Sequence, residues 1–518
     1  MAPKGSPVIE RSGRIKSQFS YSPLKYLENK RLAALLAFAF IVPFSVMLQG
    51  CGAAPGKVAP SSQQTVPSAS LQPSSANIQI WQNVQFSVAS TEDAGCTWQS
   101  SQPSVLSSLG DGQFQGNQTG TAQVSVTCGS ATATATVSVA SQQPSGPITI
   151  TSGGTYSGNW TSTDPNTPAV TIRTDEPVTI RDSTISGRGA LIDLSGVKTG
   201  ANVTIENVTG TALDPGVTGM QRGAFLSATN VTSLAVKNCS ISGSSFGIKV
   251  VGTSLSSLEI SNNLASNLED RASDGQGGLL NSRPELGHFI ILNNVSAPEG
   301  AEISWNQAVQ TIGQSSTEDV INIYNSQGSQ GHPIWVHDNY MEGSSSPVTS
   351  GHYTGTAMIT DGAATNGAQP TAFVLFQANE VVATAGTGVG IAAGHDISAT
   401  ANRIVSCGAT SAGSWYAWGA NAIVIWNYYQ SSQFYNNTIT GTVGGMVGPG
   451  TSGTPKAFDV WANPPDMLDP GNSVSGNDFT DPCLVGGTLN LQAENNERAF
   501  WTAKITGADE LIGDQHSN

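Results

Sequence analysis

Four side chains in the second half of the chain could carry out acid–base chemistry. Glu318 and Asp319 stand together in TEDVINIY, Asp361 follows in ITDG, and His395 stands in GHDI. Carboxyl groups about 5 to 10 Å apart cleave glycosidic bonds, and neighbouring acids raise one another's pKa toward neutral pH. An acid at a turn more often caps backbone amides, so a structural role stays open for each residue. These four are our catalytic candidates, provided that they share one groove.

Aromatic and histidine side chains near these acids could bind a ligand. In VINIY and PIWVHDN, apolar residues alternate with others, so Tyr324, Trp335 and His337 should face outward. In IVIWNYY, Trp426 and Tyr428 should do the same. Exposed rings suit the faces of sugars, but they also pack under long loops. We expect these five residues to bind a substrate.

No metal is expected at the catalytic candidates. The acidic loop LEDRASDGQGG carries Glu269, Asp270 and Asp274, which could bind a calcium ion. Acidic clusters in loops are more often only solvated. The sequence therefore predicts no cofactor, with calcium as an open alternative.

A loose repeat indicates which elements position these side chains. VKNCSISG, ILNNVS, VHDNYMEG and FYNNTITG are four of its copies, spaced mostly about 24 to 35 residues apart. Such a unit cannot bury its inward side chains alone, so successive coils must stack and share one core. Strands of neighbouring coils lie about 4.8 Å apart, which brings together residues that are distant in the sequence. The repeat predicts a parallel β-helix.

The Asn residues at the corners of the repeat have a structural explanation. Identical amides that stack from coil to coil can bond to one another along the axis. We expect this role, rather than chemistry, for Asn207, Asn238, Asn263, Asn294, Asn339, Asn379, Asn402 and Asn437.

The N-terminus has the features of an export signal. Basic residues precede the apolar run LAALLAFAFIVPFSVML, which ends at LQGC. LQGC resembles the bacterial lipoprotein box, which implies a signal peptide over 1–50 and lipidation of Cys51. An uncleaved membrane anchor is the alternative, although Pro43 interrupts the run. We expect the protein to be held by its lipid on a membrane of the bacterial envelope.

Two segments separate this anchor from the repeat. Residues 51–76 are rich in Ala, Pro, Ser and Gln and read as a flexible tether. Residues 77–141 alternate in period two between turn clusters, which predicts a small β-sandwich. The stretch from CTWQSSQPSV to QVSVTC resembles bacterial Ig-like domains. That resemblance implies a disulfide between Cys96 and Cys128, with two separate buried thiols as the alternative.

The repeat region, 148–518, resembles the right-handed parallel β-helix of the pectin-lyase-like superfamily. That resemblance covers most of the chain and implies binding, cleavage or modification of a polysaccharide along one face. SGGTYSGNWTS and AENNERAFWTAKITGADELIG are the candidate caps at its two ends. The expected fold is therefore all-β, a β-helix solenoid preceded by an Ig-like sandwich.

The active-site signatures of the superfamily's known enzymes are not reproduced. ISWNQ and IWVHDN resemble pectate lyase motifs, but their order is reversed and His337 and Asp338 are exchanged relative to that family. EDVINIYNSQGS, GTAMITDG and GTGVGIAAGHDISATANRI are instead similar to an uncharacterised group of bacterial β-helix proteins. Fold alone does not specify function.

The net charge restricts the possible partners, and the remaining cysteines restrict the possible disulfides. The net charge of -15 disfavours nucleic acid as a partner. Cys239, Cys407 and Cys483 are an odd number, so at least one is free or pairs outside the chain, and Cys239 is expected to be buried. We expect a protein that binds or processes a polysaccharide, as a hydrolase or lyase. A non-catalytic adhesin or scaffold is the alternative, and the oligomeric state stays open.

Overall fold

The structure is a computed structural model that describes residues 68–90, 95–197, 200–344, 355–364, 368–416, 421–450 and 453–514. The predicted signal peptide, the lipidation site Cys51 and residues 51–67 of the tether lie outside the described residues. In the part of the chain that is described, no helix is long and apolar enough to span a membrane.

An N-terminal unit of nine strands has its own core. Its strands form sheets ordered β1-β4, β2-β9-β8-β5 and β3-β7-β6 around buried Phe86, Leu106 and Phe114. Cys96 and Cys128 stand opposite each other on β5 and β8 and form a disulfide. The strands are β1 (Ala69–Gln72), β2 (Ser75–Gln79), β3 (Asn83–Gln85), β4 (Ser87–Ser90), β5 (Cys96–Ser100), β6 (Leu106–Gly110), β7 (Gln113–Gly116), β8 (Gly120–Cys128) and β9 (Ala131–Ala140).

The folded part of this unit begins earlier than the expected boundary at residue 77. β1 pairs with β4, and β2 begins at Ser75, so residues 69–76 belong to the sheets rather than to a tether. The alternating Ala69 and Leu71 of this stretch were concealed by its Ser, Gln and Pro content.

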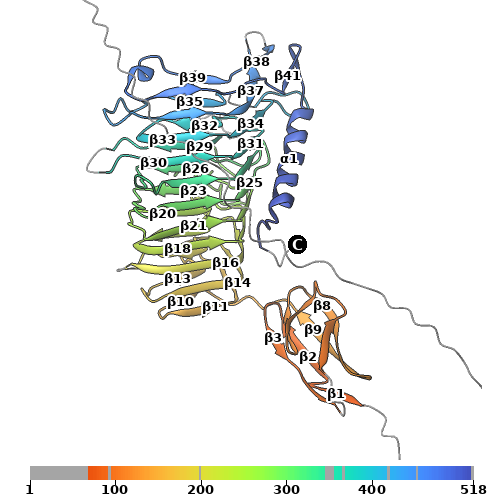
Figure 1. The fold of residues 1–518 in the computed structure, drawn as a ribbon. Coiled ribbons are helices and arrows are strands. Elements are labelled where there is room, and N and C mark those ends of the chain that lie inside the picture. The colour runs from red at the N-terminus through yellow and green to blue at the C-terminus, as the bar shows by residue number, and fades with distance from the viewer. Residues whose placement is uncertain are drawn as a thin grey trace, which may run out of the picture. The chain divides into compact units, whose positions relative to one another are not determined.

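The rest of the chain is a stack of coils, each of which adds strands to two long sheets (Figure 1). One sheet has eleven parallel strands: β10 (Ile148–Ile150), β13 (Val170–Ile172), β15 (Ile192–Asp193), β17 (Leu226–Thr229), β20 (Ile248–Val251), β23 (His288–Asn293), β26 (Asp319–Tyr324), β29 (Thr356–Asp361), β32 (Val389–Ile391), β35 (Ile423–Ile425) and β39 (Val460–Ala462). A long parallel sheet of this kind is compatible with a β-helix.

The second sheet has twenty strands, and β37 and β38 form an antiparallel pair in it. Its strands are β11 (Gly154–Tyr156), β12 (Asn159–Ser162), β14 (Val178–Gly187), β16 (Ala201–Ala212), β18 (Val231–Lys237), β19 (Ser240–Ser242), β21 (Ser257–Ser261), β22 (Leu264–Ser266), β24 (Ala301–Ser304), β25 (Gln307–Val309), β27 (Ile334–His337), β28 (Tyr340–Glu342), β30 (Ala372–Gln377), β31 (Glu380–Val382), β33 (His395–Thr400), β34 (Arg403–Ser406), β36 (Thr438–Thr440), β37 (Val443–Pro449), β38 (Pro455–Ala457) and β40 (Ser473–Ser475). A 3₁₀ turn (Asp466–Leu468) and the hairpin β41 (Leu484–Val485) and β42 (Thr488–Leu489) complete the strand-rich part.

Aliphatic columns hold the stack together. Ile290, Ile321, Met358, Val389 and Ile423 occupy the same place in successive strands of the eleven-stranded sheet, and all are fully buried. Each such side chain contributes roughly 1.5–3 kcal/mol by leaving water. This inward column fixes the register, and with it the residues that stand on the outer face.

A ladder of buried amides runs beside this core. The side-chain Nδ2 of each member donates to Oδ1 of the next at 2.9 to 3.0 Å, through Asn263, Asn306, Asn339, Asn379 and Asn402. Four of the expected Asn residues are therefore in one column, and Asn306 joins them although its sequence context, SWNQ, differs from the other copies. Each coil thereby satisfies polar groups of its neighbour.

Three other expected corner Asn residues lie outside this ladder. Asn207, Asn238 and Asn294 have φ values of 52°, 50° and 58°. Asn tolerates this left-handed conformation, which turns the chain sharply. They are corner residues by backbone conformation, and Asn207 also donates to Asp182 of the preceding coil at 3.3 Å.

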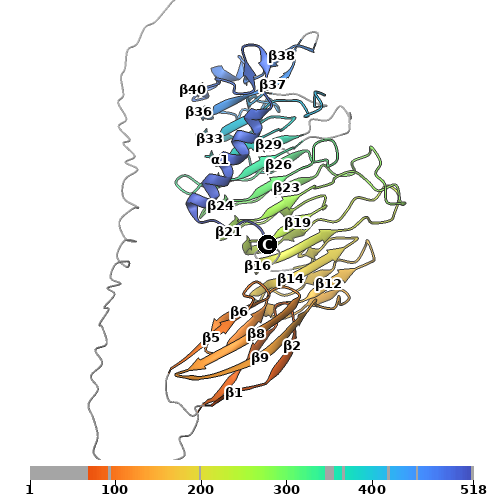
Figure 2. The same cartoon turned by 90° about the vertical axis from the view of Figure 1, so that its right-hand side faces the viewer.

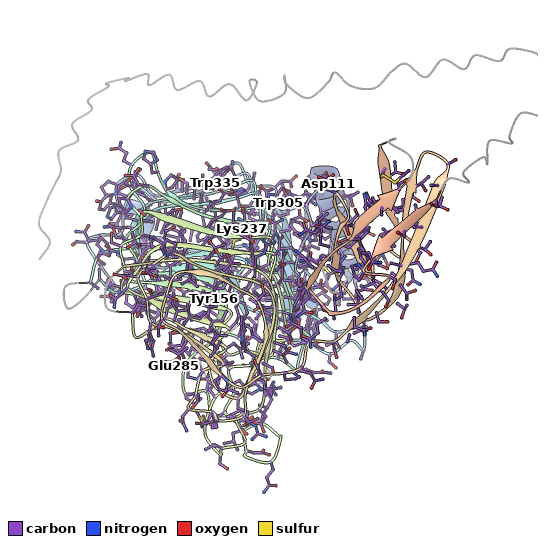
Figure 3. All side chains as sticks on the ribbon, turned by 90° about the horizontal axis from the view of Figure 1, so that it is seen from below. Asp111, Tyr156, Lys237, Glu285, Trp305 and Trp335 are labelled. Atoms are coloured by element: carbon purple, nitrogen blue, oxygen red, sulfur yellow. A yellow bond between two sulfur atoms is a disulfide. The ribbon has the colours of Figure 1, made fainter. Side chains whose placement is uncertain are left out.

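The C-terminal segment, expected to cap the end of the stack, runs along its side. Helix α1 (Gln492–Ala508) crosses several coils (Figure 2), and Figure 3 shows Trp305 next to it. Trp501 stacks on Tyr340 at 5.2 Å between ring centroids. Arg498 bonds to Glu342 at 2.7 Å.

Chain beyond the helix continues toward earlier coils. Asn262 donates to the Glu510 carboxylate at 2.7 Å, and Thr209 donates to Asp514 at 2.6 Å. Cys407 and Cys483 form a disulfide just before the helix begins, and Cys239 is a free, buried thiol.

Candidate functional site

The acidic candidates Glu318, Asp319 and Asp361 lie on the eleven-stranded sheet, with Glu318 and Asp319 together and Asp361 at the opposite edge of that sheet. Asp319 begins β26, and Asp361 ends β29, where it stands opposite Tyr324. His288, which the sequence analysis did not select, begins β23 and stands opposite Asp319. Stacking of three successive coils therefore places these residues on one sheet.

The His288 ring faces both acids of the pair. Its Nδ1 lies 3.2 Å from the backbone carbonyl of Asp319, and because a carbonyl only accepts, Nδ1 carries the hydrogen. Its Nε2 lies 3.7 Å from Glu318 Oε2. Burial lowers the pKa of His288 to about 3, so the ring is neutral at physiological pH.

The two carboxyl groups are destabilised in their charged forms. Burial raises the pKa of Glu318, and repulsion by Asp319 and then Asp361 adds to the rise. Burial also raises the pKa of Asp319, and Asp361 adds to it. Asn322 donates to Asp319 Oδ2 at 2.8 Å and partly opposes this shift. Glu318 keeps 23% of its side chain exposed, so a ligand can reach this carboxyl group.

Asp361 links the acids to aromatic residues. Tyr429 donates its hydroxyl to Asp361 Oδ1 at 2.6 Å, and the backbone of Gly362 donates to the same oxygen at 2.8 Å. Burial raises the pKa of Tyr429, and the Asp361 carboxylate raises it further. Burial and the same carboxylate also raise the pKa of Tyr324. Both phenols therefore stay protonated and can act as donors.

Exposed rings continue from Tyr429 over the neighbouring coils. Tyr428 makes edge contacts with Tyr429 and with Trp426, each at 4.9 Å between centroids. Trp461, on the next strand β39, lies 6.3 Å from Trp426. Trp426, Tyr428 and Trp461 are 38%, 55% and 54% exposed, so they form an accessible aromatic surface. We call these three residues and Tyr429 the aromatic platform.

His395 does not join the acid cluster. It begins β33 on the twenty-stranded sheet, where its Nδ1 lies 2.8 Å from Asp396 Oδ2 and its ring stacks on Tyr435 at 4.7 Å. A cavity of about 490 Å³ lined by Tyr435, Gln430 and neighbouring residues lies beside it. GHD marks a corner between the two sheets, and Asp361 stands at the same side of the stack: Thr371 donates to the Asp361 carbonyl at 2.7 Å and accepts from the His395 amide at 3.0 Å.

Trp335 and His337 also lie on the twenty-stranded sheet, apart from Tyr324. Trp335 is 38% exposed, but His337 is buried beneath it, with ring centroids 3.7 Å apart. His337 lies between Asp338, at 2.8 Å, and Glu302, at 3.3 Å. The His337 side chain points outward, as the alternation along β27 predicted, but the Trp335 indole covers its ring. Trp335 and Glu302 line a cavity of about 340 Å³.

The acidic loop considered for calcium binds its own chain. Glu269 forms an ion pair with Arg271 at 2.7 Å, and Asp270 is buried against Arg283. Asp274 accepts two backbone hydrogen bonds, at 2.7 and 2.9 Å. These contacts give each carboxylate a structural role.

The signal that could have identified His288 lies in the repeat itself. Three coils align position by position, without gaps, over HFIILNN, DVINIYN and TAMITDG. This alignment places His288, Asp319 and Thr356 in one column. Tyr429 carries no such signal, because its position depends on the path of the chain after strand β35.

Comparison with known protein families found no family model that matches the chain, and comparison with curated proteins found no match. Functional conclusions therefore depend on the geometry described above.

Proposed function

We propose that the protein is a right-handed parallel β-helix of the pectin-lyase type that binds and processes a polysaccharide on the outer face of its eleven-stranded sheet. In this proposal β1 to β9 are an Ig-like spacer, and lipidated Cys51 holds the chain on the bacterial envelope. The support is the all-β stack, the carboxyl cluster and the aromatic platform.

One observation carries the proposal. The hydrogen bond from Tyr429 to Asp361 joins the aromatic platform to an acid of the same sheet that carries Glu318 and Asp319. Aromatic rings bind the apolar faces of sugars, and carboxyl groups beside them can transfer protons at a glycosidic oxygen or at a sugar carbon. A chain of sugars that lies across successive coils would reach both.

The roles follow from exposure. Asp361 and Glu318 are the partly exposed acids and would contact the substrate, whereas Asp319 and His288 are buried behind them. Trp426, Tyr428 and Trp461 would hold neighbouring sugars. His395, Trp335 and His337 are not part of this site.

Turnover of plant, algal and bacterial polysaccharides by the purified protein tests the proposal. We expect one of them to be shortened by the wild type, and we expect Asp361→Asn to lower the rate at least 100-fold, as loss of a general acid or base does. Asp111→Asn, in the N-terminal unit, is the matched control and should retain full activity. If the wild type shortens none of the substrates, the catalytic version is wrong.

A non-catalytic surface module is the second candidate. The observation that favours it is the burial of Asp319 and His288, which leaves few acids in contact with solvent. Glycan binding that is unchanged in Asp361→Asn but lost in Trp426→Ala would support this version.

The anchor is tested separately. Wild-type protein should partition into detergent through its acyl chains, and Cys51→Ser should move it to the aqueous phase. Unchanged partitioning would remove the lipoprotein assignment without affecting the sugar site.

A further inference from the structure

We propose that His288, Glu318 and Asp319 bind a divalent transition-metal ion of the zinc or manganese class. One ligand atom from each residue lies within 4.8 Å of the others, with Glu318 Oε2 at 3.7 Å from Nε2 of His288 and Asp319 Oδ2 at 3.7 Å from Nδ1, so Asp319 must rotate toward Nε2 to share the ion. An imidazole nitrogen and two carboxylates are a ligand set that these ions accept. The site is formed by β23, β26 and the residue before β26, in adjacent coils.

The orientation of His288 leaves one nitrogen available for a metal. Because Nδ1 donates to the Asp319 carbonyl, the lone pair of Nε2 is free to bind. This arrangement, in which one ring nitrogen is fixed by a backbone carbonyl, is the usual second contact of a metal-binding histidine. His288 is only 3% exposed, so its ring is held in place.

The distances suit a single ion. Nε2 of His288 and Oε2 of Glu318 are 3.7 Å apart, which is too long for a hydrogen bond. Two ligands with bonds of about 2.1 Å can be up to about 4.2 Å apart on one ion. The widest separation in the group, at most 4.8 Å, needs only a small side-chain rotation.

Within the described ranges, Glu318 and Asp319 lack an ion-pair partner that is permanently positive. The ion pairs recorded among the described residues give Glu318 and Asp319 no lysine or arginine partner, and His288 is their basic neighbour. The guanidinium of Arg283 is bound to Asp270 instead. A divalent cation would supply the missing charge, which buried carboxylates require.

Asn322 provides an independent indication. It is 2% exposed and holds Asp319 by a bond from Nδ2 to Oδ2, while its own Oδ1 is buried without a hydrogen-bond partner. A buried amide oxygen without a partner is costly. Beside an ion, this oxygen could be a fourth ligand or accept from a metal-bound water.

The nitrogen ligand sets the class of ion. Calcium takes six to eight oxygen ligands, whereas one imidazole with two carboxylates suits zinc or manganese. A bound ion would supply a Lewis acid on the sheet that also carries Asp361. The inference does not depend on the proposed sugar chemistry, because binding is measured without a substrate.

Calorimetric titration of the chelator-treated protein with zinc, manganese or calcium chloride tests the inference. We expect one zinc or manganese ion per chain and weak or no calcium binding. Removing a ligand in His288→Gln should weaken binding at least about 100-fold, and Asn322→Ala should weaken it about 10–100-fold. His395→Gln, another histidine bonded to an aspartate, is the matched control and should bind like the wild type.

Two further measurements keep the result interpretable. Glu318→Gln changes a partly exposed side chain and should fold normally, so loss of binding in this variant cannot be attributed to unfolding. Zinc should also raise the melting temperature of the wild type but not of Glu318→Gln. No zinc or manganese binding by the wild type, or binding that His395→Gln abolishes and Glu318→Gln leaves intact, would overturn the proposal.

Discussion

Asp361 is the residue at which the two halves of the proposed site meet. Its carboxylate accepts from Tyr429 and from a backbone amide, and its charge raises the pKa values of Glu318 and Asp319. The Asp361 carboxylate thus orients Tyr429 of the aromatic platform and also adds to the rise in the pKa of Glu318 and Asp319. Changes at this residue should affect both sugar binding and the state of the cluster.

Tyr429→Phe should separate these two effects. It keeps the ring and removes the hydroxyl that bonds to Asp361, and a hydrogen bond to a charged group is worth about 1.5–3 kcal/mol. We expect a roughly tenfold or larger loss of polysaccharide affinity with little change in the unfolding midpoint. Tyr156→Phe, in the first coil, is the control. Equal affinities for Tyr429→Phe and the wild type would show that the hydroxyl does not position the platform.

Glu380 provides a pH-dependent prediction outside the site. It is fully buried, and burial raises its pKa to about 7 although the Lys504 ammonium lies 3.2 Å away. Between its ordinary value of 4.5 and about 7, the folded protein holds a proton that the unfolded chain has lost. Stability should therefore fall as pH rises through this range, by on the order of a few kcal/mol.

Glu380→Gln should remove this dependence. Urea unfolding at pH 4.5 and at a pH above 7 should give a smaller difference for the variant than for the wild type, with the gain at the higher pH. Glu299→Gln, at an exposed residue, should behave like the wild type at both values. A variant that loses stability equally at both pH values would indicate that the ion pair with Lys504 dominates.

At the scale of elements, the amide ladder ties one coil to the next. Asn339 donates to Ile303, His337 and Asn379 and accepts from Asn306, and it is completely buried. No other side chain of similar size can donate and accept in both directions along the axis. The ladder therefore requires Asn at this place in the coils between Asn263 and Asn402.

Asn339→Ala should be strongly destabilising. It leaves several buried groups without partners, at about 1–3 kcal/mol each, so we expect a loss above about 3 kcal/mol in urea unfolding. Asn496→Ala, on the exposed side of α1, should change stability by less than about 0.5 kcal/mol. A loss at Asn339 no larger than at Asn496 would mean that water replaces the missing amide.

The sequence predicts these elements better than it predicts the site. Asn and aliphatic residues recur from coil to coil, so the stack and most of the ladder can be predicted from the repeat. The acid pair is also visible, because no stacking role accounts for Glu318 and Asp319. The meeting of His288 with Asp319 depends on register across 31 residues of loop and strand, and loops between coils differ in length. GHD likewise does not reveal to which sheet His395 belongs.

At the scale of the whole molecule, the C-terminal segment fastens coils that are far apart in the sequence. Glu494 accepts from the backbone of Cys407 at 2.8 Å, Trp501 donates to Gln307 at 3.1 Å, and Asp514 accepts from Thr209. Solenoid coils contact only their nearest neighbours, so their stability is otherwise local. This segment adds long-range contacts that couple distant coils.

The disulfide that precedes the helix should contribute to this coupling. Cys407 and Cys483 are 76 residues apart, and closing a loop of this length stabilises by up to about 4 kcal/mol in the chain-entropy view. We expect Cys407→Ser with Cys483→Ser to lower the unfolding midpoint of the stack. Cys96→Ser with Cys128→Ser, in a unit with a separate core, should leave that transition unchanged. Equal effects of the two pairs on the stack would contradict this assignment.

The position of α1 also constrains the order in which the protein can acquire its structure. Coils can form one after another as the chain is synthesised or exported, since each needs only its predecessor as a template. Residues 492–514 come later in the chain than every coil that they contact. They can therefore pack against the stack only after all of those coils have been synthesised. Until then the flanks of Tyr340 and Val382, which pack around Trp501, are open to water. The nascent protein should therefore pass through a stage in which the stack is complete in outline but remains accessible to proteases and chaperones along one side.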